Sequence, residues 1–374
     1  MPKFEYTTLA QRYTARFPLL TYVGTQVNFW IMANVLLVII LNLQQRIIDQ
    51  SLNTSIAVKF ESILLIAIIS GIFYGISLGL SGYYLDRSSF GKLPLGEIIV
   101  FKAGGSLILL TILLWLLQIL LFNSSTASLF YIPGLIFNEG SWRYLIYLLL
   151  IYYFFMTLII SFINQVNRKY GPGVLVPLLL GRYRNPREEE RIFMFMDLKS
   201  STTTAERLGH LRYSAFIRDC YGDINEILFP FRAQVYQYVG DEIVVMWPAS
   251  EGLKNHFCIR FYFACQDKFR DRRTYYTKTY GFIPEFKAGL HMGKVTAVEI
   301  GEIKKDIAYH GDTLNTAARI QGVCNEYNKD FIVSDCLIER VGENRRMTTE
   351  DLGMILLRGK TEKVRILSVG WCVS

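Results

Sequence analysis

Long apolar stretches alternate with short polar segments in the first half of the chain. Four of them suit membrane-spanning helices, because about 20 helical residues cross the hydrocarbon core of a bilayer. These stretches cover residues 28–43, 62–85, 98–122 and 144–166, with Asn34 inside the first and shortest. The pattern predicts a four-helix membrane domain over residues 1–166, embedded in the lipid bilayer.

Basic residues favour one orientation of this domain. They concentrate before the first stretch, in the second connection and after the fourth stretch, at Lys3, Arg12, Arg16, Arg87, Lys92, Arg168 and Lys169. Cytoplasmic segments carry the excess of Lys and Arg. We therefore expect both termini, and everything after residue 166, to lie in the cytoplasm.

Glycines recur every four residues in the second stretch. Gly71, Gly75 and Gly79 fall on one face of a helix, where small residues let another helix approach closely. Two hypotheses follow. The face is either a contact between two copies of the chain or a packing surface inside one four-helix bundle.

Residues 167–190 form a connector with a composition of its own. Gly171, Pro172 and Gly173 end the fourth helix, and an apolar run and a second Gly/Pro-containing stretch follow. The connector is either a plain tether or an element that carries a signal and sets how two catalytic domains pair.

The second half has the composition of a water-soluble domain. The net charge of the chain is +8, but no block of Lys and Arg with interleaved aromatic residues occurs, so we expect no nucleic-acid partner. All 6 cysteines lie in this half, none in a CxxC pair, with only 4 histidines in the chain. This spacing offers no zinc site, and we expect reduced thiols.

A short apolar run over residues 191–198 predicts a buried strand that ends in Asp197. Three hydroxyl residues then begin a helical pattern: Ser200, Ser201 and Thr202. A carboxylate before such a turn suits a metal–phosphate site. The carboxylate binds Mg²⁺, and the free N–H groups of the helix start face phosphate oxygens. The alternative is an ordinary helix cap.

Two β-rich runs, 233–239 and 243–247, flank the pair Gly240–Asp241 and predict a hairpin with Asp241 at its tip. Placed side by side, Asp197 and Asp241 would bind two metal ions, which orient an attacking oxygen and stabilise a leaving one. An Asp in such a turn is also ordinary turn chemistry. Its combination with Asp197 is what favours a site.

The string from Gly311 to Arg319 opens a further helix. Asn315 and Arg319 are four residues apart and therefore share one face. An Asn that holds a ribose and an Arg that neutralises charge on a pentavalent phosphorus suit phosphoryl transfer. The alternative is an exposed Arg on a surface helix.

These segments, in this order, resemble the class III nucleotidyl cyclases, the family of adenylyl and guanylyl cyclases. The resemblance covers about residues 188–372, and the connector is similar to that of a bacterial membrane-bound subgroup with four transmembrane helices. It implies an α+β catalytic domain over residues 191–374, with a ferredoxin-like βαββαβ core of antiparallel strands and helices. It also implies an integral protein of the bacterial inner membrane.

The resemblance further implies the role of each residue. Asp197 and Asp241, with Leu198, would bind two Mg²⁺ or Mn²⁺ ions. Asn315 would position the ribose, and Arg319 would stabilise the transition state as ATP becomes cyclic AMP and pyrophosphate. Lys360 would bind phosphate. The family builds its site from two catalytic domains, so a homodimer paired through the catalytic domain and connector is implied.

The chain departs from the family at the residues that recognise the base. Gln237 stands where Lys or Glu is usual, and Ala308 stands where Asp, Thr or Cys is usual. A Gln amide both donates and accepts hydrogen bonds, whereas an Ala side chain does neither, and Tyr309 or His310 would have to substitute. ATP is expected from the family's bacterial members, with GTP as the alternative.

Three other functions fit the pattern less well. A diguanylate cyclase needs a second Gly where this chain has Val239, and that family lacks the helix that carries Asn315 and Arg319 in this chain. A non-catalytic nucleotide sensor has no need of an intact pair of metal-binding aspartates. A four-span transporter needs polar groups within its spans.

Overall fold

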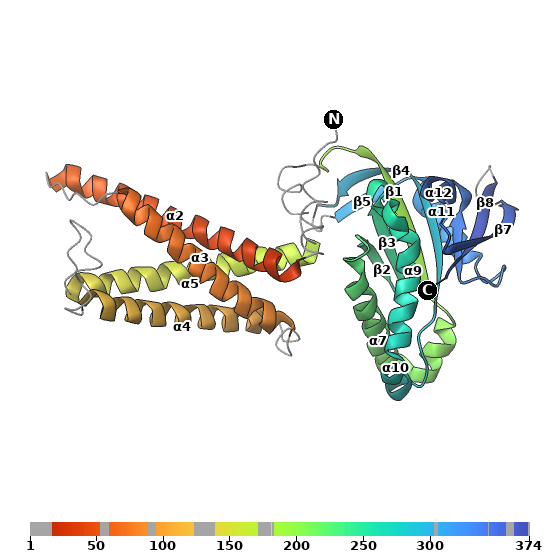
Figure 1. The fold of residues 1–374 in the computed structure, drawn as a ribbon, viewed down its shortest axis with the longest axis horizontal. Coiled ribbons are helices and arrows are strands. Elements are labelled where there is room, and N and C mark those ends of the chain that lie inside the picture. The colour runs from red at the N-terminus through yellow and green to blue at the C-terminus, as the bar shows by residue number, and fades with distance from the viewer. Residues whose placement is uncertain are drawn as a thin grey trace. The chain divides into compact units, whose positions relative to one another are not determined.

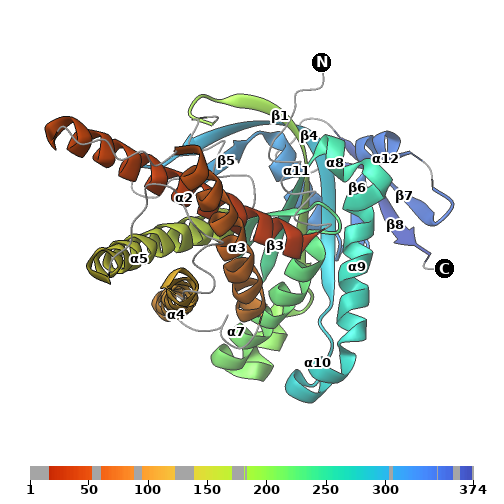
Figure 2. The ribbon, with the colours of Figure 1, turned by 60° about the vertical axis from the view of Figure 1, so that its left-hand side comes forward.

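The computed structural model describes residues 17–52, 60–87, 95–122, 139–170, 181, 183–302, 306–342, 344–356 and 363–372. The chain divides into two compact units, with the boundary after Leu175. Figures 1 and 2 show the elements of both units.

The first unit contains four long helices (Figure 1): α2 (Pro18–Leu52), α3 (Phe60–Arg87), α4 (Leu95–Phe122) and α5 (Glu139–Tyr170). Each has a stretch long and apolar enough to cross a membrane: Pro18–Ser51, Ile63–Leu85, Gly96–Leu116 and Trp142–Val166. Only 22% to 33% of the most apolar part of each stretch is buried, which suits helices whose outer faces contact lipid. The prediction of four candidate membrane helices is confirmed.

The first helix begins earlier than the sequence predicts, at Pro18 and not at residue 28. Polar residues interrupt the apolar pattern there, but their polar groups have intrahelical partners or turn inward. Thr25 Oγ1 donates to the carbonyl of Thr21 (2.8 Å), and Gln26 is 5% exposed. The hydropathy pattern does not register such satisfied polar groups and therefore predicts a shorter span.

The glycine face of α3, formed by Gly71, Gly75 and Gly79, packs against α2. A Cβ atom added to Gly75 would lie 2.5 Å from the Cα atom of Val27, and at the other two positions it would meet main-chain atoms of α2 at 2.8 and 2.9 Å. Only glycine permits this approach. The face lies inside one chain, so the hypothesis of a dimer contact there is wrong and packing within the bundle is confirmed.

Polar groups meet inside the bundle. Tyr74 Oη lies 2.6 Å from Oγ of Ser106, and that atom lies 2.7 Å from Oγ1 of Thr157. Tyr153 Oη donates to Asn34 Oδ1 (2.7 Å). These hydrogen bonds join all four helices and satisfy polar groups where no water is available.

The second unit is built on one sheet with the strand order β2-β3-β1-β4-β6-β8-β7, and β5 pairs with β4. The strands are β1 (Arg187–Leu198), β2 (Gln234–Val239), β3 (Glu242–Pro248), β4 (Phe286–Ile300), β5 (Asp306–His310), β6 (Phe331–Ser334), β7 (Met347–Ile355) and β8 (Val364–Trp371). The segment β2-β3-β1-β4 is antiparallel throughout, as the predicted ferredoxin-like core requires. Beyond that core the sheet continues with β6, which pairs with β4 in parallel.

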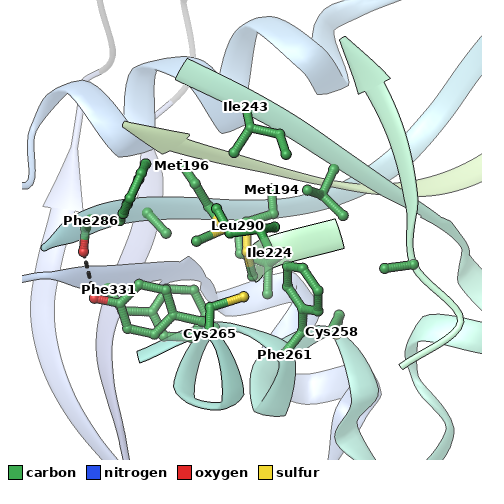
Figure 3. Close-up of a cluster of buried hydrophobic side chains, with 14 of the residues drawn as sticks. Met194, Met196, Ile224, Ile243, Cys258, Phe261, Cys265, Phe286, Leu290 and Phe331 are labelled. Atoms are coloured by element: carbon green, nitrogen blue, oxygen red, sulfur yellow. Dashed lines mark hydrogen bonds between the residues drawn. The ribbon is translucent and has the colours of Figure 1, made fainter. Parts of the chain in front are cut away.

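Helices cover both faces of the sheet. They are α7 (Ser201–Leu228), α8 (Ala249–Gly252), η3 (Lys254–His256), α9 (Phe257–Asp271), α10 (Arg273–Tyr280), α11 (Asp312–Gly322) and α12 (Asp335–Val341). On β1, Met194 and Met196 belong to the cluster shared with α7 and α9 (Figure 3), while Phe193 and Phe195 belong to the cluster shared with α11. Both faces of β1 are therefore buried, as in a central strand.

Thiols contribute to the core of the second unit. Cys258 and Cys265 lie in the cluster of Figure 3, and all six cysteines of the chain are free. Four are buried, and Cys336 and Cys372 are exposed. Burial raises the pKa of Cys258 to about 12, so this thiol stays protonated and acts as a small apolar side chain.

Candidate active site

Asp197 stands near the end of the central strand β1. Its neighbours across the sheet are Glu242 on β3 and Lys287 on β4. Nζ of Lys287 lies 3.2 Å from Oδ2 of Asp197, and Nε2 of Gln321 on α11 donates to the same oxygen from 3.3 Å. One carboxylate oxygen therefore has two partners, while Oδ1 has none among the described residues.

Leu198 follows Asp197 and pairs with Phe286 on β4. Its side chain is 3% exposed and belongs to the main core. An aliphatic side chain cannot bind a cation, so only the main-chain carbonyl of Leu198 is available as a ligand.

Asp241 lies in the two-residue turn between β2 and β3. Val239 pairs with Glu242, and Gly240 has a φ of 62°. A positive φ at the first central residue alone is the pattern of a type II′ turn, which favours Gly there. Tyr221 on α7 donates its hydroxyl to the carbonyl of Gly240 (3.0 Å). The turn that carries Asp241 is therefore tied to α7.

Carboxylates crowd at this corner of the sheet. Burial raises the pKa of Glu242, and the charges of Asp197 and Asp241 raise it further. Burial and the same two charges raise the pKa of Tyr213 to about 12. Both effects place Asp197 and Asp241 near Glu242 and Tyr213.

The donor set suits a hard cation. Carboxylate oxygens are the ligands that Mg²⁺ prefers, and Mg²⁺ commonly takes only one or two of them, with phosphate oxygens and water completing its shell. Across the described residues, no group of three or more His, Cys, Asp or Glu side chains is arranged to hold a metal ion. A cation at Asp197 and Asp241 would therefore complete its shell with water or with oxygens of a substrate.

An open groove of 740 Å³ adjoins the hairpin tip and α7. Asp241, Tyr213, Tyr221 and Tyr238 are among its lining residues. Tyr238 donates its hydroxyl to Asn225 on α7 (2.8 Å), and its ring centroid lies 5.0 Å from that of Tyr221. Aromatic side chains and a carboxylate therefore line this groove.

The start of α7 lies beside Asp197. Ser200 has a φ of 54°, and α7 begins at Ser201, followed by Thr202. No side chain caps this helix start, and its first turn holds no acidic residue. Its unpaired N–H groups and the positive end of its dipole are therefore free to face an anion.

Asn315 and Arg319 lie on α11, which packs closely on β4. A Cβ atom at Gly289 of β4 would overlap main-chain atoms of Gln321, so this glycine is what lets the helix approach the strand. Asn315 is exposed and Arg319 is half-buried. Neither side chain has a hydrogen bond or ion pair with the residues that the structure describes.

Asn315 and Arg319 lie on a helix that reaches Asp197 through another residue. Gln321 contacts Asp197, but Asn315 lies six residues earlier on the same helix, about 9 Å along its axis. No hydrogen bond or ion pair between described residues joins Asn315 or Arg319 to either aspartate.

The residues expected to recognise the base differ in exposure. Gln237 is exposed on β2, whereas Ala308 on β5 is 8% exposed. Tyr309 is buried, with its ring centroid 5.8 Å from that of Phe193. His310 is exposed.

Two predicted features fall outside the described residues. Lys360 belongs to the connection between β7 and β8, and most of the connector lies in the segment 171–180. Conversely, the contacts of Lys287, Gln321 and Tyr221 were not predicted from the sequence. The register of β1 against β4 would reveal Lys287, but that register is not encoded in any short motif.

Known proteins share this domain. Residues 184–368 match the family described as "Adenylate and Guanylate cyclase catalytic domain". The chain is 35% identical over 210 residues to adenylate cyclase 2 of Rhizobium meliloti (strain 1021). This alignment covers 56% of this chain and 58% of that protein. It is 23% identical over 182 residues to an adenylate cyclase of Anabaena cylindrica, over 47% of this chain and 36% of that one. The chain thus spans little more than half the length of the first of these relatives and about a third of the second.

The fold is also similar to a solved structure of a bacterial light-regulated adenylyl cyclase, at 18% identity and a TM-score of 0.48. The alignment covers 57% of this chain and 64% of the light-regulated protein.

Proposed function

Residues 184–368 belong to the adenylate and guanylate cyclase catalytic domain family, and on that premise we propose that this chain is a membrane-bound adenylate cyclase. It converts ATP to cyclic AMP and pyrophosphate. Residues 1–166 anchor the protein in a bacterial inner membrane. Residues 167–190 connect this membrane domain to residues 191–374, which catalyse the reaction on the cytoplasmic side. The observation that carries the proposal is that the charges of Asp197 and Asp241 both act on Glu242, while Asp241 also lines a groove.

The two aspartates hold two Mg²⁺ or Mn²⁺ ions in this proposal, with the carbonyl of Leu198. Such ions, when bound, polarise the ribose 3′-hydroxyl and neutralise charge on the phosphates. The neighbouring carboxylates support this. Burial is the main cause of the raised pKa of Glu242, and the charges of Asp197 and Asp241 raise it further by a repulsion that a cation would relieve. Ser200, Ser201 and Thr202, at the uncapped start of α7, face the phosphate oxygens.

The remaining groups come from a second copy of the chain. Arg319 has no carboxylate partner among the described residues, so its charge is available to stabilise the pentavalent phosphorus, while Asn315 orients the ribose. Because neither contacts Asp197 or Asp241 of its own chain, we propose a homodimer with two composite sites. Lys360 binds the leaving pyrophosphate.

GTP is the second candidate substrate. Gln237 is exposed and has both a donor and an acceptor, while Ala308 contributes neither. ATP is favoured because the two curated relatives named above are adenylate cyclases.

Mixing two inactive variants tests the proposal. Full-length Asp241→Ala and Arg319→Ala proteins should each lose cyclic nucleotide formation from ATP or GTP with Mg²⁺ or Mn²⁺. Their mixture should regain part of it, because a heterodimer has one intact site. Asp271→Ala, at an exposed position of α9, is the matched control and should stay active. A mixture that exchanges subunits but stays inactive would rule out shared sites.

A further inference from the structure

A second hollow, of 560 Å³, lies at the β7–β8 edge of the sheet. Its lining residues come from η3 and the start of α9, the end of α12, the segment just before β7 and the end of β8. In the sheet order, β4 and β6 separate β8 from β1, which carries Asp197. Neighbouring strands are about 5 Å apart, so this hollow is separate from the proposed catalytic site.

The polar groups that line this hollow are mainly hydrogen-bond donors. The charged residues among the described lining are Arg260 and Arg346, whose guanidinium groups only donate. Asn344 Oδ1 accepts from the main-chain N–H of Arg346 (2.9 Å), which leaves its Nδ2 as the group available to a ligand. No Asp or Glu is among the described residues that line the hollow. The chemistry of such a lining selects an anion.

Neither arginine is neutralised by a carboxylate of the described residues. Arg260 donates to the carbonyl of Asn255 (3.3 Å) and lies over the rings of Phe231 and Trp371, at 5.7 and 6.0 Å from their centroids. These contacts hold the guanidinium group in place without neutralising its positive charge. The side chain of Arg346 is exposed, and its carbonyl accepts from the N–H of Cys372 (2.8 Å).

His256 is also among the residues that line the hollow. Nε2 of His256 is buried and has no hydrogen-bond partner among the described residues. Such a group is uncommon in a folded protein and calls for an explanation. His256 also has a φ of 58° and immediately precedes α9, whose first turn holds no acidic residue and no side-chain cap. A ligand that accepts a hydrogen bond would satisfy Nε2.

We propose that this hollow binds the phosphate group of a small ligand or a lipid, independently of the catalytic site. A phosphate monoester has two negative charges and three acceptor oxygens, which match two guanidinium groups, an amide donor and an imidazole. Guanidinium groups pair with phosphate in a bidentate manner. Trp371 supplies an apolar wall for the group that carries the phosphate.

Tryptophan emission of the full-length protein in detergent tests the proposal. Inorganic phosphate and glycerol 3-phosphate are titrated separately in EDTA, so that metal-bound phosphate at Asp197 and Asp241 does not contribute. We expect a saturable change that disappears in Trp371→Phe. In Arg260→Gln/Arg346→Gln the half-saturating concentration should rise at least about tenfold, because charge-assisted hydrogen bonds are lost.

The control and the lipid experiment complete the test. Arg273→Gln/Arg345→Gln removes the same charge from exposed positions outside the hollow and should bind like the wild type. Nanodiscs of phosphatidylcholine with and without phosphatidic acid distinguish the source, because a headgroup site responds only to phosphatidic acid. No response to any probe, or an equal response in the Arg260/Arg346 variant, overturns the proposal. Arg346→Gln alone carries the test if the double variant unfolds.

Discussion

The ammonium group of Lys287 lies 3.2 Å from the carboxylate of Asp197, the residue proposed to bind metal. The Lys287 side chain is 14% exposed, so solvent screens its charge only in part. A cation already present in the chain therefore offsets the repulsion among the crowded carboxylates. A metal ion that binds Asp197 must share this oxygen with Lys287 or displace it.

Replacing Lys287 should strengthen metal binding. In Lys287→Met the Mg²⁺ concentration for half-maximal cyclic AMP formation should fall about three- to tenfold, because a competing charge a few ångströms away is removed. Lys278→Met, at an exposed position of α10, should leave it unchanged. Activity measured across Mg²⁺ concentrations decides between these outcomes, and a higher requirement in Lys287→Met would mean that the lysine supports the site.

Tyr221 should act as a positioning residue for Asp241. Tyr221→Phe removes the hydroxyl that donates to Gly240 (3.0 Å), and a hydrogen bond of this kind contributes about 1 kcal/mol. We expect kcat to fall about fivefold and the Mn²⁺ requirement to rise, since the turn that carries a metal ligand loosens.

Tyr275→Phe is the control for this substitution. It also removes a tyrosine hydroxyl from a hydrogen bond, to Asp219, but at a position that does not line the groove. It should affect stability and not the Mn²⁺ requirement. If the two variants show the same metal dependence, Tyr221 does not position the turn.

Local signals were enough to predict the elements that carry the site. A strand that ends in Asp197 and a Gly240–Asp241 turn depend only on neighbouring residues, and the structure has both. The ferredoxin-like strand order followed from the family resemblance. The contact of Lys287 with Asp197 depends instead on the register of β1 and β4, which many residues determine jointly.

The rest of the molecule depends on packing between distant segments. The early start of α2 depends on Gln26 being buried in the bundle, and the role of Gly75 depends on which helix lies against it. The hollow at Arg260 and Arg346 combines segments that are far apart in the sequence. No spacing rule of a single helix or strand brings such groups together.

Acid should weaken the contact between α7 and α10. Burial alone would raise the pKa of Asp219, but hydrogen bonds from Tyr275 and Tyr280 (both 2.6 Å) and the charge of Arg218 hold it below its usual value of 3.8. Because the pKa of Asp219 is lower in the folded state than in the unfolded state, its ionised carboxylate stabilises the fold at pH values above the unfolded-state pKa. This stability is lost as pH falls through the folded pKa.

Denaturation of the full-length protein at several pH values tests this contact. Asp219→Asn should be less stable than the wild type at pH 7 by about 1–3 kcal/mol, since bonds to a charged acceptor are lost. The difference should shrink below about pH 4. Asp271→Asn, with an exposed side chain, should match the wild type throughout. A difference that does not change with pH would mean that Asp219 acts by packing and not by its charge.

The glycine face of α3 predicts a difference between two Gly→Ala substitutions in the membrane unit. At Gly75 a Cβ atom would lie 2.5 Å from Cα of Val27, whereas at Gly104 of α4 nothing lies within 4 Å. Gly75→Ala should force α2 and α3 apart and cost about 1–3 kcal/mol. Gly104→Ala should be neutral or slightly stabilising, because Ala favours the helix. Thermal denaturation in detergent measures both, and size-exclusion chromatography should show the same oligomer for both, because the face packs within one chain. If the oligomer of Gly75→Ala dissociates while the membrane unit stays folded, this glycine face would form a contact between two chains, against the prediction.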